Sequence, residues 1–526
     1  MKRNKILYLG LIVALPMLLT VLGCKKFLDR KPLTSTLEDI NQGTLEAQSF
    51  GLYNTLTNYA GFSTLPMLDF HSIRDDDAQK GSSLTDGAEI NTEFETFQYS
   101  KDSWAPNTYW NDRYYMINQA NKLIYFADSL QLTDPASLRN VGEACFFRAF
   151  CFFELVKTYG DVPLINYYYT SAAAGVKPKS PASAIYAQID ADLTKAAAYL
   201  PVNWTVANVN IYPGRLTKGA ANTLRAQTYL FRQNWASVIA YCTQVEMSAQ
   251  YNLAPTFPDI WKDGLNGAGK NGIESVWEEQ SYVGPNSTPD KGTDFGTCQN
   301  VRQGGASNAW NLGWGWNAPT QKLETDWPNT DPRKRQTILY SGQADGGPIQ
   351  GGYGATVPSY GPGTGGLDQP YWNKKVYSDP QMRQFTGQIF QNGAARWINH
   401  RILRYADVLL MHAEASNEMA DGATAAVYLE RVRFRASGLT APDPGHTRTV
   451  VPYVPFVSQA QMRTAIKNER RWEFAMEGYR FYDLVRWGDA IAELGALGYT
   501  NRCRFYPIPQ KAIDLSGGVL IQNPEW

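Results

Sequence analysis

Eight acidic and basic side chains stand among bulky apolar residues between Asn468 and Gly488, and their types and spacing could do chemistry. They are Glu469, Arg470, Arg471, Glu473, Glu477, Arg480, Asp483 and Arg486. Two of the carboxylates could act as the acid and base that cleave a glycosidic bond. That reaction needs one carboxyl group with a raised pKa, whereas adjacent arginines lower it. We therefore favour a structural ion-pair network over a catalytic pair.

The same stretch predicts a helix, or two helices that meet near Gly478. It contains no proline, and Gly488 stands where a helix C-cap is expected. Residues three or four apart share a helix face, so we expect Arg470–Glu473, Glu469–Glu473 and Arg480–Asp483 to be neighbours. The many aromatic residues leave no wholly polar face. Some of the charges must then be partly buried, and buried charges need partners.

Aromatic side chains in two other stretches could stack on the flat face of a sugar ring. We predict a loop around Trp104, ahead of a helix at Trp110, and a second loop from Trp310 to Trp316 in which glycines permit close approach. The candidate binding residues are Trp104, Asn107, Tyr109, Trp310, Trp314 and Trp316. The alternative is that these rings pack against the helices or against a partner protein.

Other chemical motifs are weak, so we expect no cofactor and no metal. Gly264 to Asn271 is nearly a P-loop, but Asn271 replaces the residue that holds magnesium, and no strand precedes the motif. The stretch 361–366 matches a dinucleotide motif only through its glycine content. Asp75, Asp77 and Gln79 alternate like calcium ligands, but the loop lacks the glycine and the final acid of an EF-hand, so we expect a solvated loop or a helix cap.

The charge balance, the histidines and the cysteines argue against several further classes of function. Lys+Arg 49 and Asp+Glu 49 balance, which argues against a nucleic-acid partner. The four histidines are too scattered for a catalytic triad. Beyond Cys24 the chain has five cysteines, an odd number without zinc-type spacing, and we expect mostly buried free thiols.

The first residues form a targeting segment rather than part of the fold. A basic start precedes an apolar run from Ile6 to Leu22, and Val21 to Cys24 matches a bacterial lipobox. We predict a signal peptide over 1–23 and lipidation of Cys24, since several acyl chains anchor a protein stably. The alternative is an ordinary signal peptide followed by an incidental cysteine.

Helical patterns fill the remainder of the first half and return near the end. The early helices are expected at Glu46–Tyr59, Trp110–Asn121, Gly142–Tyr159, Ser183–Leu200 and Thr217–Arg232, and the later ones at Arg401–Met419 and Tyr428–Gly438. Paired helices with small residues at their contacts favour tetratricopeptide-like hairpins. Between Tyr251 and Lys375, glycine, proline, asparagine and tryptophan crowd together. The predicted fold is mostly α, with tetratricopeptide-like hairpins and a long loop-rich, aromatic insertion.

Several segments, in order along the chain, carry a family resemblance. They are GEACFFRAFCFFELVKTYGDVPLI, RLTKGAANTLRAQTYL, RILRYADVLLMHAEASNEM, YLERVRFRASG, ERRWEFAMEGYRFYDLVRWG, YPIPQKAI and the closing QNPEW. Together they resemble the SusD/RagB family of lipid-anchored outer-membrane proteins. The resemblance implies a helical region over 24–245 and a C-terminal region over 246–526 that holds the insertion at about 281–375.

The resemblance also implies a function. It predicts a cell-surface protein, facing the cell exterior, that binds a nutrient, most often a glycan, and delivers it to a SusC-like TonB-dependent transporter in the outer membrane. It further implies that the rings of the two aromatic stretches converge, and that the protein is not an enzyme. Two alternatives remain open: a glycoside hydrolase, and a scaffold that binds a peptide with its helical hairpins.

Overall fold

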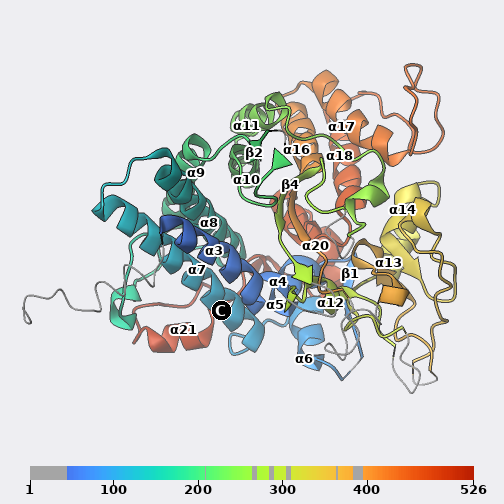
Figure 1. Cartoon of the computed structure of the whole chain (residues 1–526). Helices are drawn as coiled ribbons and strands as arrows, with labels where there is room; N and C mark the ends of the chain where they lie inside the picture. Colours follow the sequence, from blue (N-terminus) through green and yellow to red (C-terminus); the bar gives the residue numbers. More distant parts are fainter. Residues whose placement is uncertain are drawn as a thin grey trace, which may run out of the picture.

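The computed structural model is mostly helical, and Figure 1 shows the late helices beside the early ones. The structure describes residues 44–83, 85–207, 209–263, 269–283, 290–303, 310–362, 365–382 and 395–526. The signal segment, Cys24 and most of the glycine-rich motif at 264–271 lie outside these ranges. Among the described residues, no helix combines the length and apolar character that a membrane crossing requires.

The early half is built from long helices that pack on their sequence neighbours. The long ones are α3 (Leu45–Asn58), α7 (Trp104–Ser129), α8 (Pro135–Tyr159), α9 (Ala182–Tyr199), α10 (Lys218–Phe231) and α11 (Trp235–Met247). Short turns between α3 and α7 are α4 (Ala60–Ser63), α5 (Leu65–Leu68), η1 (Asp69–Ile73), α6 (Ala88–Ile90) and η2 (Asn91–Glu95). Helix α8 lies against α7 and α9, and α10 lies against α11. The predicted helical hairpins are therefore confirmed.

Local sequence explains why α8 begins and ends where it does. The Asp134 side chain accepts hydrogen bonds from two backbone N–H groups of the first turn, and Pro135 occupies the first helical position. Gly160 follows the last residue with a φ of 76°, a conformation that costs glycine little. Nearly every residue from Asn140 to Tyr159 is buried, as the continuous apolar pattern predicts.

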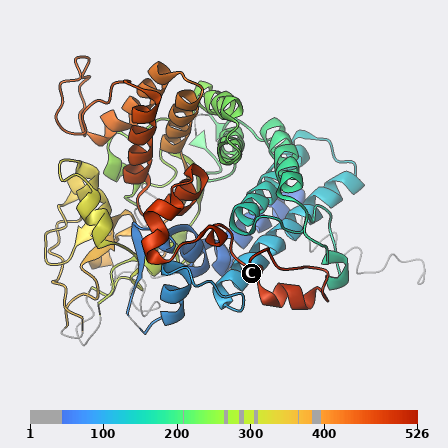
Figure 2. The same cartoon turned by 180° about the vertical axis from the view of Figure 1, so that it is seen from behind.

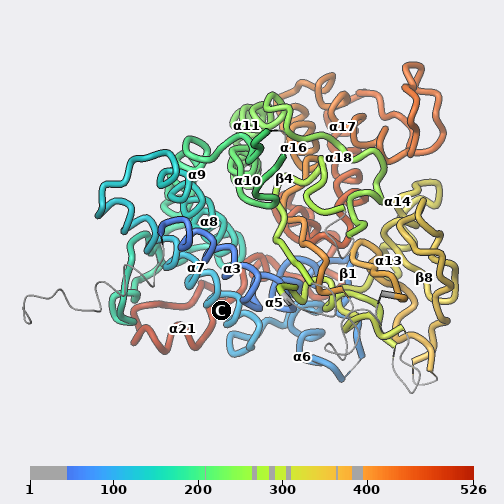
Figure 3. Tube along the Cα trace, in the orientation of Figure 1, coloured from blue at the N-terminus to red at the C-terminus, as the bar shows by residue number. Residues whose placement is uncertain are grey.

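The described strands form antiparallel pairs that tie distant segments together. The pairs are β1 (Ala78–Gly81) with β7 (Trp316–Pro319), β2 (Thr205–Val206) with β3 (Val209–Asn210), β4 (Ser275–Glu279) with β10 (His400–Arg404), β5 (Tyr282–Val283) with β6 (Asp290–Lys291), and β8 (Ile338–Tyr340) with β9 (Tyr371–Asn373). Between β8 and β9 the described residues, 341–362 and 365–370, run mostly as irregular loops at one side of the molecule, with the short 3-10 helix η6 (Pro348–Gln350) among them (Figure 3). Strand pairs at its borders therefore hold the loop-rich middle in place.

Figure 2 shows most of the late helices (orange to red) at the top and the centre of the view, whereas the last one lies at the lower edge beside the C-terminus. After the short helices α12 (Phe295–Gln299), α13 (Gln321–Asp326) and α14 (Pro332–Thr337) come α16 (Tyr405–Glu418), α17 (Gly422–Ala436), α18 (Gln459–Phe474), α19 (Arg480–Trp487), α20 (Ala490–Leu494) and α21 (Gln510–Leu515). One expectation was wrong. Residues 401–404 do not start a helix, because they belong to β10 and pair with β4.

The charged stretch between Asn468 and Gly488 is a buried ion-pair network. It forms two helices, α18 and α19, and Gly478 between them has a φ of 81°. Glu473 has no exposed surface. Its carboxylate lies 3.0 Å from a guanidinium nitrogen of Arg333, 3.0 Å from one of Arg404 and 2.5 Å from one of Arg435. The structural interpretation of this stretch is confirmed.

The partners within that network differ from those expected. Arg470 does not pair with Glu473, and Arg480 does not pair with Asp483. The Arg470 guanidinium instead bonds Asp407, at 2.7 Å, and Asp483, at 2.8 Å. Because both partners come from other helices, the network fastens α18 to α16 and α19.

Asp75, Asp76 and Asp77 are buried, so the prediction of a solvated loop was wrong. The Asp76 carboxylate accepts from Arg480 at 2.8 Å, and the Asp77 carboxylate accepts from Arg471 at 2.6 Å. These bonds join the turn before β1 to the two late helices, and they explain why Asp76 and Asp77 can leave water. The Asp75 carboxylate accepts instead from the backbone N–H groups of Asp77 and Ala78, both at 2.8 Å.

The five cysteines from Cys145 onward are all free and buried, as expected. Burial raises the pKa of the Cys145 thiol to about 12, which keeps it protonated and unreactive. No group of three or more metal-ligating side chains occurs within the described ranges.

Candidate ligand-binding surface

The strand pair β1–β7 brings the early helical half beside the tryptophan-rich segment. Gly81 pairs with Trp316, and the Ser82 backbone N–H donates to the Gly315 carbonyl at 2.7 Å. A side chain on Gly81 would meet that carbonyl, since a Cβ there would lie 2.2 Å from the oxygen. Close backbone contact therefore fixes the position of the loop that precedes β7.

The segment 85–90 touches both predicted aromatic stretches. Gly87 lies against the Trp316 ring, where an added Cβ would be 2.7 Å from the nearest ring atom. Two residues later, the Glu89 carboxylate accepts a hydrogen bond from the Trp104 indole N–H at 3.4 Å. Both stretches therefore border one short segment of chain, next to β1. We call the surface formed by β1, β7, residues 82–83 and 85–90, Trp104, Trp314 and Arg302 the β1–β7 surface.

The early aromatic stretch is helical, so the prediction of a loop around Trp104 was wrong. Trp104 is the first residue of α7, and 44% of its surface is exposed. Asn107, one turn later, is half-buried. Tyr109 is fully buried, and its hydroxyl donates to Glu154 at 2.5 Å. Of these three residues, Trp104 has the most surface to offer a ligand.

The later aromatic stretch is irregular up to Gly315, as expected, and then enters β7. Trp310 and Trp314 are half-buried, whereas Trp316 is only 2% exposed. The Trp310 ring is nearly parallel to the Tyr377 ring, at a centroid distance of 6.3 Å. Trp316 lies under the Lys80 ammonium group, 5.0 Å from the nitrogen to the ring centre. Trp316 therefore supports the surface from below.

Polar side chains that sequence reasoning missed cluster at the same place. Arg302 donates to the Ser82 hydroxyl and lies 3.4 Å from Asp86 and 3.3 Å from Asp368. The Gln369 side-chain amide donates to the Ser82 carbonyl at 2.9 Å. No motif marks these residues, because they come from separate segments that only the β1–β7 pairing brings together. They supply charged and amide hydrogen-bonding groups beside the exposed rings.

Lys80 holds the loop that carries Asp86. Its ammonium group donates to the carbonyls of Gly81, Ser83 and Asp86, at 3.0, 3.0 and 2.9 Å. Burial lowers the pKa of this lysine, since removal from water disfavours the charged form. Three carbonyl acceptors satisfy all three ammonium N–H groups, so Lys80 fixes the loop in place rather than offering a free charge.

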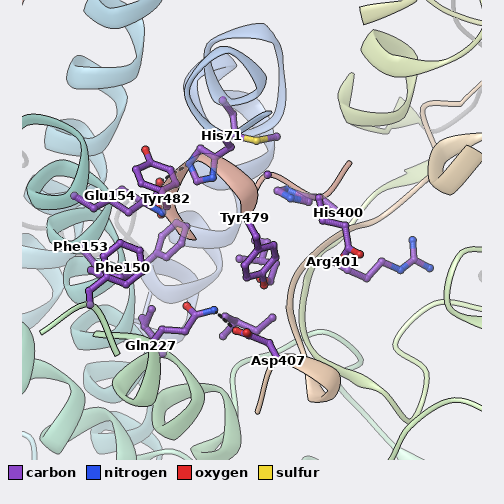
Figure 4. A pocket seen from close by; sticks show the side chains of 18 of the residues that line it. His71, Phe150, Phe153, Glu154, Gln227, His400, Arg401, Asp407, Tyr479 and Tyr482 are labelled. Carbon is purple, nitrogen blue, oxygen red and sulfur yellow. Dashed lines mark hydrogen bonds and ion pairs between the residues drawn. The ribbon is translucent and has the colours of Figure 1, made fainter. Parts of the chain in front are cut away.

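An interior cavity of about 90 Å³ lies where α8 and α10 face β10 and the break between α18 and α19 (Figure 4). His71 and Lys157 bond the Glu154 carboxylate, at 2.7 and 2.6 Å, and the Gln227 amide donates to Asp407 at 2.7 Å. A cavity of about 150 Å³ is needed to hold one benzene ring. The space is thus too small for a sugar ring.

The electrostatics of that cavity are those of a structural core. Burial opposes the charged form of Glu154, but Lys157, His71 and Arg113 outweigh it and hold the pKa of the carboxyl well below its usual range. Burial also lowers the pKa of His71 to about 4, so the ring is neutral at pH 7. The pKa values of both groups therefore lie well below 7, whereas an efficient general acid or base has a pKa near the operating pH.

Two protein-family models match the chain and together cover most of it. The model described as "SusD family" matches residues 273–502, and the model described as "Starch-binding associating with outer membrane" matches residues 26–230. Among curated proteins, SusD-like protein P2 of Formosa agariphila is 25% identical over 100% of both chains. A SusD-like protein of Bacteroides ovatus is 22% identical over 94% of this chain and 85% of the other.

Solved structures share the fold. A structure titled as a laminarin-binding SusD-like protein is 25% identical, covers 92% of this chain and 99% of its own, and has a TM-score of 0.69. Surface glycan-binding protein A of Bacteroides thetaiotaomicron, solved with laminarihexaose, is 21% identical over 91% of this chain and 98% of its own, with a TM-score of 0.70. The second likeness concerns the fold alone.

Proposed function

This chain belongs to the SusD family, and from that premise we propose that it is a cell-surface glycan-binding lipoprotein that delivers its ligand to a SusC-like TonB-dependent transporter. The description of one matching family model names starch binding and association with the outer membrane. A similar solved protein is titled as laminarin-binding. These names support a neutral glucan as the first ligand class to test.

The observation that carries the proposal is the composition of the β1–β7 surface. Trp104 presents an exposed ring, and Trp314, next to the Gly315 that bonds Ser82, presents part of its ring. Arg302 and Asp86 add charged hydrogen-bonding groups at the edge. A sugar has an apolar face of C–H groups and a rim of hydroxyls, so it needs rings for the first and polar groups for the second. The β1–β7 surface offers both.

We narrow the proposed binding residues to those with accessible surface. Trp104, Trp310 and Trp314 remain as the stacking rings, and Asn107 remains as a polar neighbour of Trp104. Tyr109 and Trp316 have almost no exposed surface, at 0% and 2%. A buried ring has no free face for a ligand, so Trp316 supports the surface from below, whereas Tyr109 packs in the core against Phe70 and bonds Glu154.

Anchoring through Cys24 remains part of the proposal. The lipobox at Val21 to Cys24 supports a diacylglycerol anchor, which would hold the protein beside an outer-membrane transporter. The proposal also states that the chain binds its glycan without cleaving it. Burial opposes the ionised form of Glu473, but Arg435, Arg404 and Arg333 prevail and lower its pKa to about 2, so this carboxyl cannot serve as a general acid at pH 7.

Affinity electrophoresis of the full-length protein in detergent tests the proposal. Gels that contain laminarin, starch, xylan or mannan should retard the wild type in at least one case, without release of reducing ends. Trp104→Ala and Trp314→Ala should each weaken the interaction by about 5- to 150-fold, the cost of about 1–3 kcal/mol for removing a central ring. Met419→Ala, at a residue that is 53% exposed on the late helices, is the matched control. Free migration in every gel would refute glycan binding.

A further inference from the structure

A second cavity, of about 190 Å³, lies between the start of α11, the ends of α16 and α19, and the middle of α18. It shares no residue with the β1–β7 surface. In Figure 1 the labels of α11, α16 and α18 stand in the upper half of the molecule, whereas β1 and α6 stand in the lower half. We call this cavity the α11–α19 cleft. It exceeds the volume of about 150 Å³ that accommodates a six-membered benzene ring.

Trp235 lines the α11–α19 cleft with an aromatic ring that packs partly against the hydrophobic core. It is the first residue of α11 and is half-buried. Among the described residues, its ring has no aromatic or cationic partner and its indole N–H donates no hydrogen bond. An aromatic face carries negative partial charge, which attracts the C–H groups of a sugar face. The indole N–H can donate to a hydroxyl.

Trp487 forms a fixed wall of the same cleft. Its indole N–H donates to Glu414 at 2.8 Å. The Lys467 ammonium nitrogen lies 5.1 Å from the ring, and the Arg486 guanidinium carbon lies 4.8 Å from it. Side chains on both sides therefore fix Trp487, whereas Trp235 packs against the hydrophobic core and keeps part of its surface accessible.

Asn417 places an unpaired acceptor in the lining of the cleft. The residue is only 1% exposed, and its side-chain N–H donates to the Gln459 carbonyl at 3.1 Å. That bond fixes the orientation of the amide, and the side-chain oxygen has no hydrogen-bond partner among the described residues. An unpaired buried acceptor destabilises a protein by about 1–3 kcal/mol. A donor O–H from a bound molecule would satisfy it.

The cationic side chains that line the cleft are already paired with carboxylates, and this pairing determines the charge of the ligand that fits. Arg463 makes two bonds to Glu418, at 2.6 and 2.7 Å, and Lys467 bonds Asp489 at 2.6 Å. Arg486 is likewise bonded to Glu414. An anionic ligand would have to displace these partners, since no lining cation is left without a carboxylate. The cleft therefore favours a neutral, hydroxyl-rich molecule.

We propose that the α11–α19 cleft is a second glycan-binding site, which holds one ring of a neutral polysaccharide with the sugar face on Trp235 and a hydroxyl donating to Asn417. The proposal rests on the proposed glycan-binding function. Two separate sites on one chain increase retention of a polymer, because binding at one raises the local concentration of glycan at the other.

Isothermal titration of the full-length protein in detergent tests this site, with laminarihexaose, maltohexaose, xylohexaose and mannohexaose as probes. For the hexasaccharide that binds, the wild type should bind two molecules, and Trp235→Ala should bind one. Trp235→Tyr, which keeps a ring, should retain the second site. Affinity for the corresponding polysaccharide should fall at least tenfold in Trp235→Ala. Met247→Ala, at the far end of α11 and 79% exposed, is the matched control.

The outcomes separate this proposal from the proposed function. The wild type could instead show a single site that Trp104→Ala or Trp314→Ala removes and Trp235→Ala leaves intact. That result overturns binding at the α11–α19 cleft and supports binding at the β1–β7 surface. Binding that depends on Trp235 alone supports the cleft and overturns the β1–β7 placement. Absence of binding to every probe overturns both. If Trp235→Ala does not fold, Gln233→Ala replaces it, because Gln233 is exposed at the rim of the cleft.

Discussion

Replacing Glu473 by glutamine should destabilise the fold strongly, because three arginines depend on its charge. The carboxylate is fully buried and contacts Arg333, Arg404 and Arg435. Glutamine has nearly the same shape, so the substitution removes charge without opening a cavity. It would leave guanidinium groups in the interior with less compensation than they have now.

Two separate estimates give a similar loss in the free energy of unfolding for Glu473→Gln. Breaking a buried ion pair by removing one partner costs about 3–5 kcal/mol. The pKa of Glu473 falls from 4.5 to about 2 in the folded chain, and each unit is worth about 1.4 kcal/mol, so the ionised carboxylate stabilises the fold by roughly 3 kcal/mol at neutral pH. This contribution is present above pH 4.5 and is lost as the pH falls towards 2.

Calorimetry of the full-length protein at pH 7 measures the effect. With an unfolding entropy of about 2 cal/mol/K per residue, a chain of 526 residues that unfolds as one unit should lose about 3–5 °C in Tm. Asp190→Asn is the control, because its pair with Arg232 is 28% and 23% exposed and contributes at most about 1 kcal/mol. A Tm of Glu473→Gln within 1 °C of the wild type would refute the assignment of a stabilising network.

Three other predictions follow from the structure and the lipobox. Burial lowers the pKa of His71 to about 4 and of His400 to about 3. Below about pH 6.5 the unfolded chain binds protons at these histidines while the folded chain does not, so Tm should fall as the pH is lowered from 6.5 towards 4. A flat profile of Tm against pH would contradict this. Cys24→Ala should abolish labelling by a fatty-acid analogue and release the protein from the outer membrane; a labelled variant would refute the lipobox. Arg471→Ala should lower the free energy of unfolding by several kcal/mol, because it leaves Asp77 buried without its main partner, and an unchanged denaturant midpoint would contradict that.

Sequence patterns sufficed for the helices that are defined by local contacts. The apolar run of α8, with Asp134 before it and Gly160 after it, carries its own start and stop signals. The start of α7 was missed, because the helix was expected only from Trp110, whereas it begins at Trp104 and contains Pro106 in its first turn. Proline is also tolerated in the first helical turn, where its missing N–H has no partner to lose, and α7 uses it there.

Ion-pair partners were not predictable in the same way. Spacing along α18 predicted a pair between Arg470 and Glu473, but Arg470 bonds Asp407, which is 63 positions away in the chain. Arg480 bonds Asp76, at a separation of 404 positions. Local periodicity identifies residues on one helix face, but it does not identify which distant element covers that face.

The arrangement of the candidate binding residues was also only partly predictable from local sequence patterns. The abundance of tryptophan pointed to Trp104 and to the segment 310–316, and the exposed Trp104 ring fits that expectation. Burial of Trp316 follows from its place in β7 beneath Gly87, a contact between segments more than 200 positions apart. The contribution of Arg302 depends on the same strand pairing.

The affinity of the β1–β7 surface for a glycan is the most direct test of the function assigned to this chain. Titration with the hexasaccharide whose polymer retards the wild type should show binding that weakens by at least fivefold in Trp104→Ala and in Trp314→Ala. The Tm of both variants should stay within about 2 °C of the wild type, since neither ring is fully buried. Unchanged affinity in both variants, with their stability intact, would show that the glycan binds elsewhere or not at all.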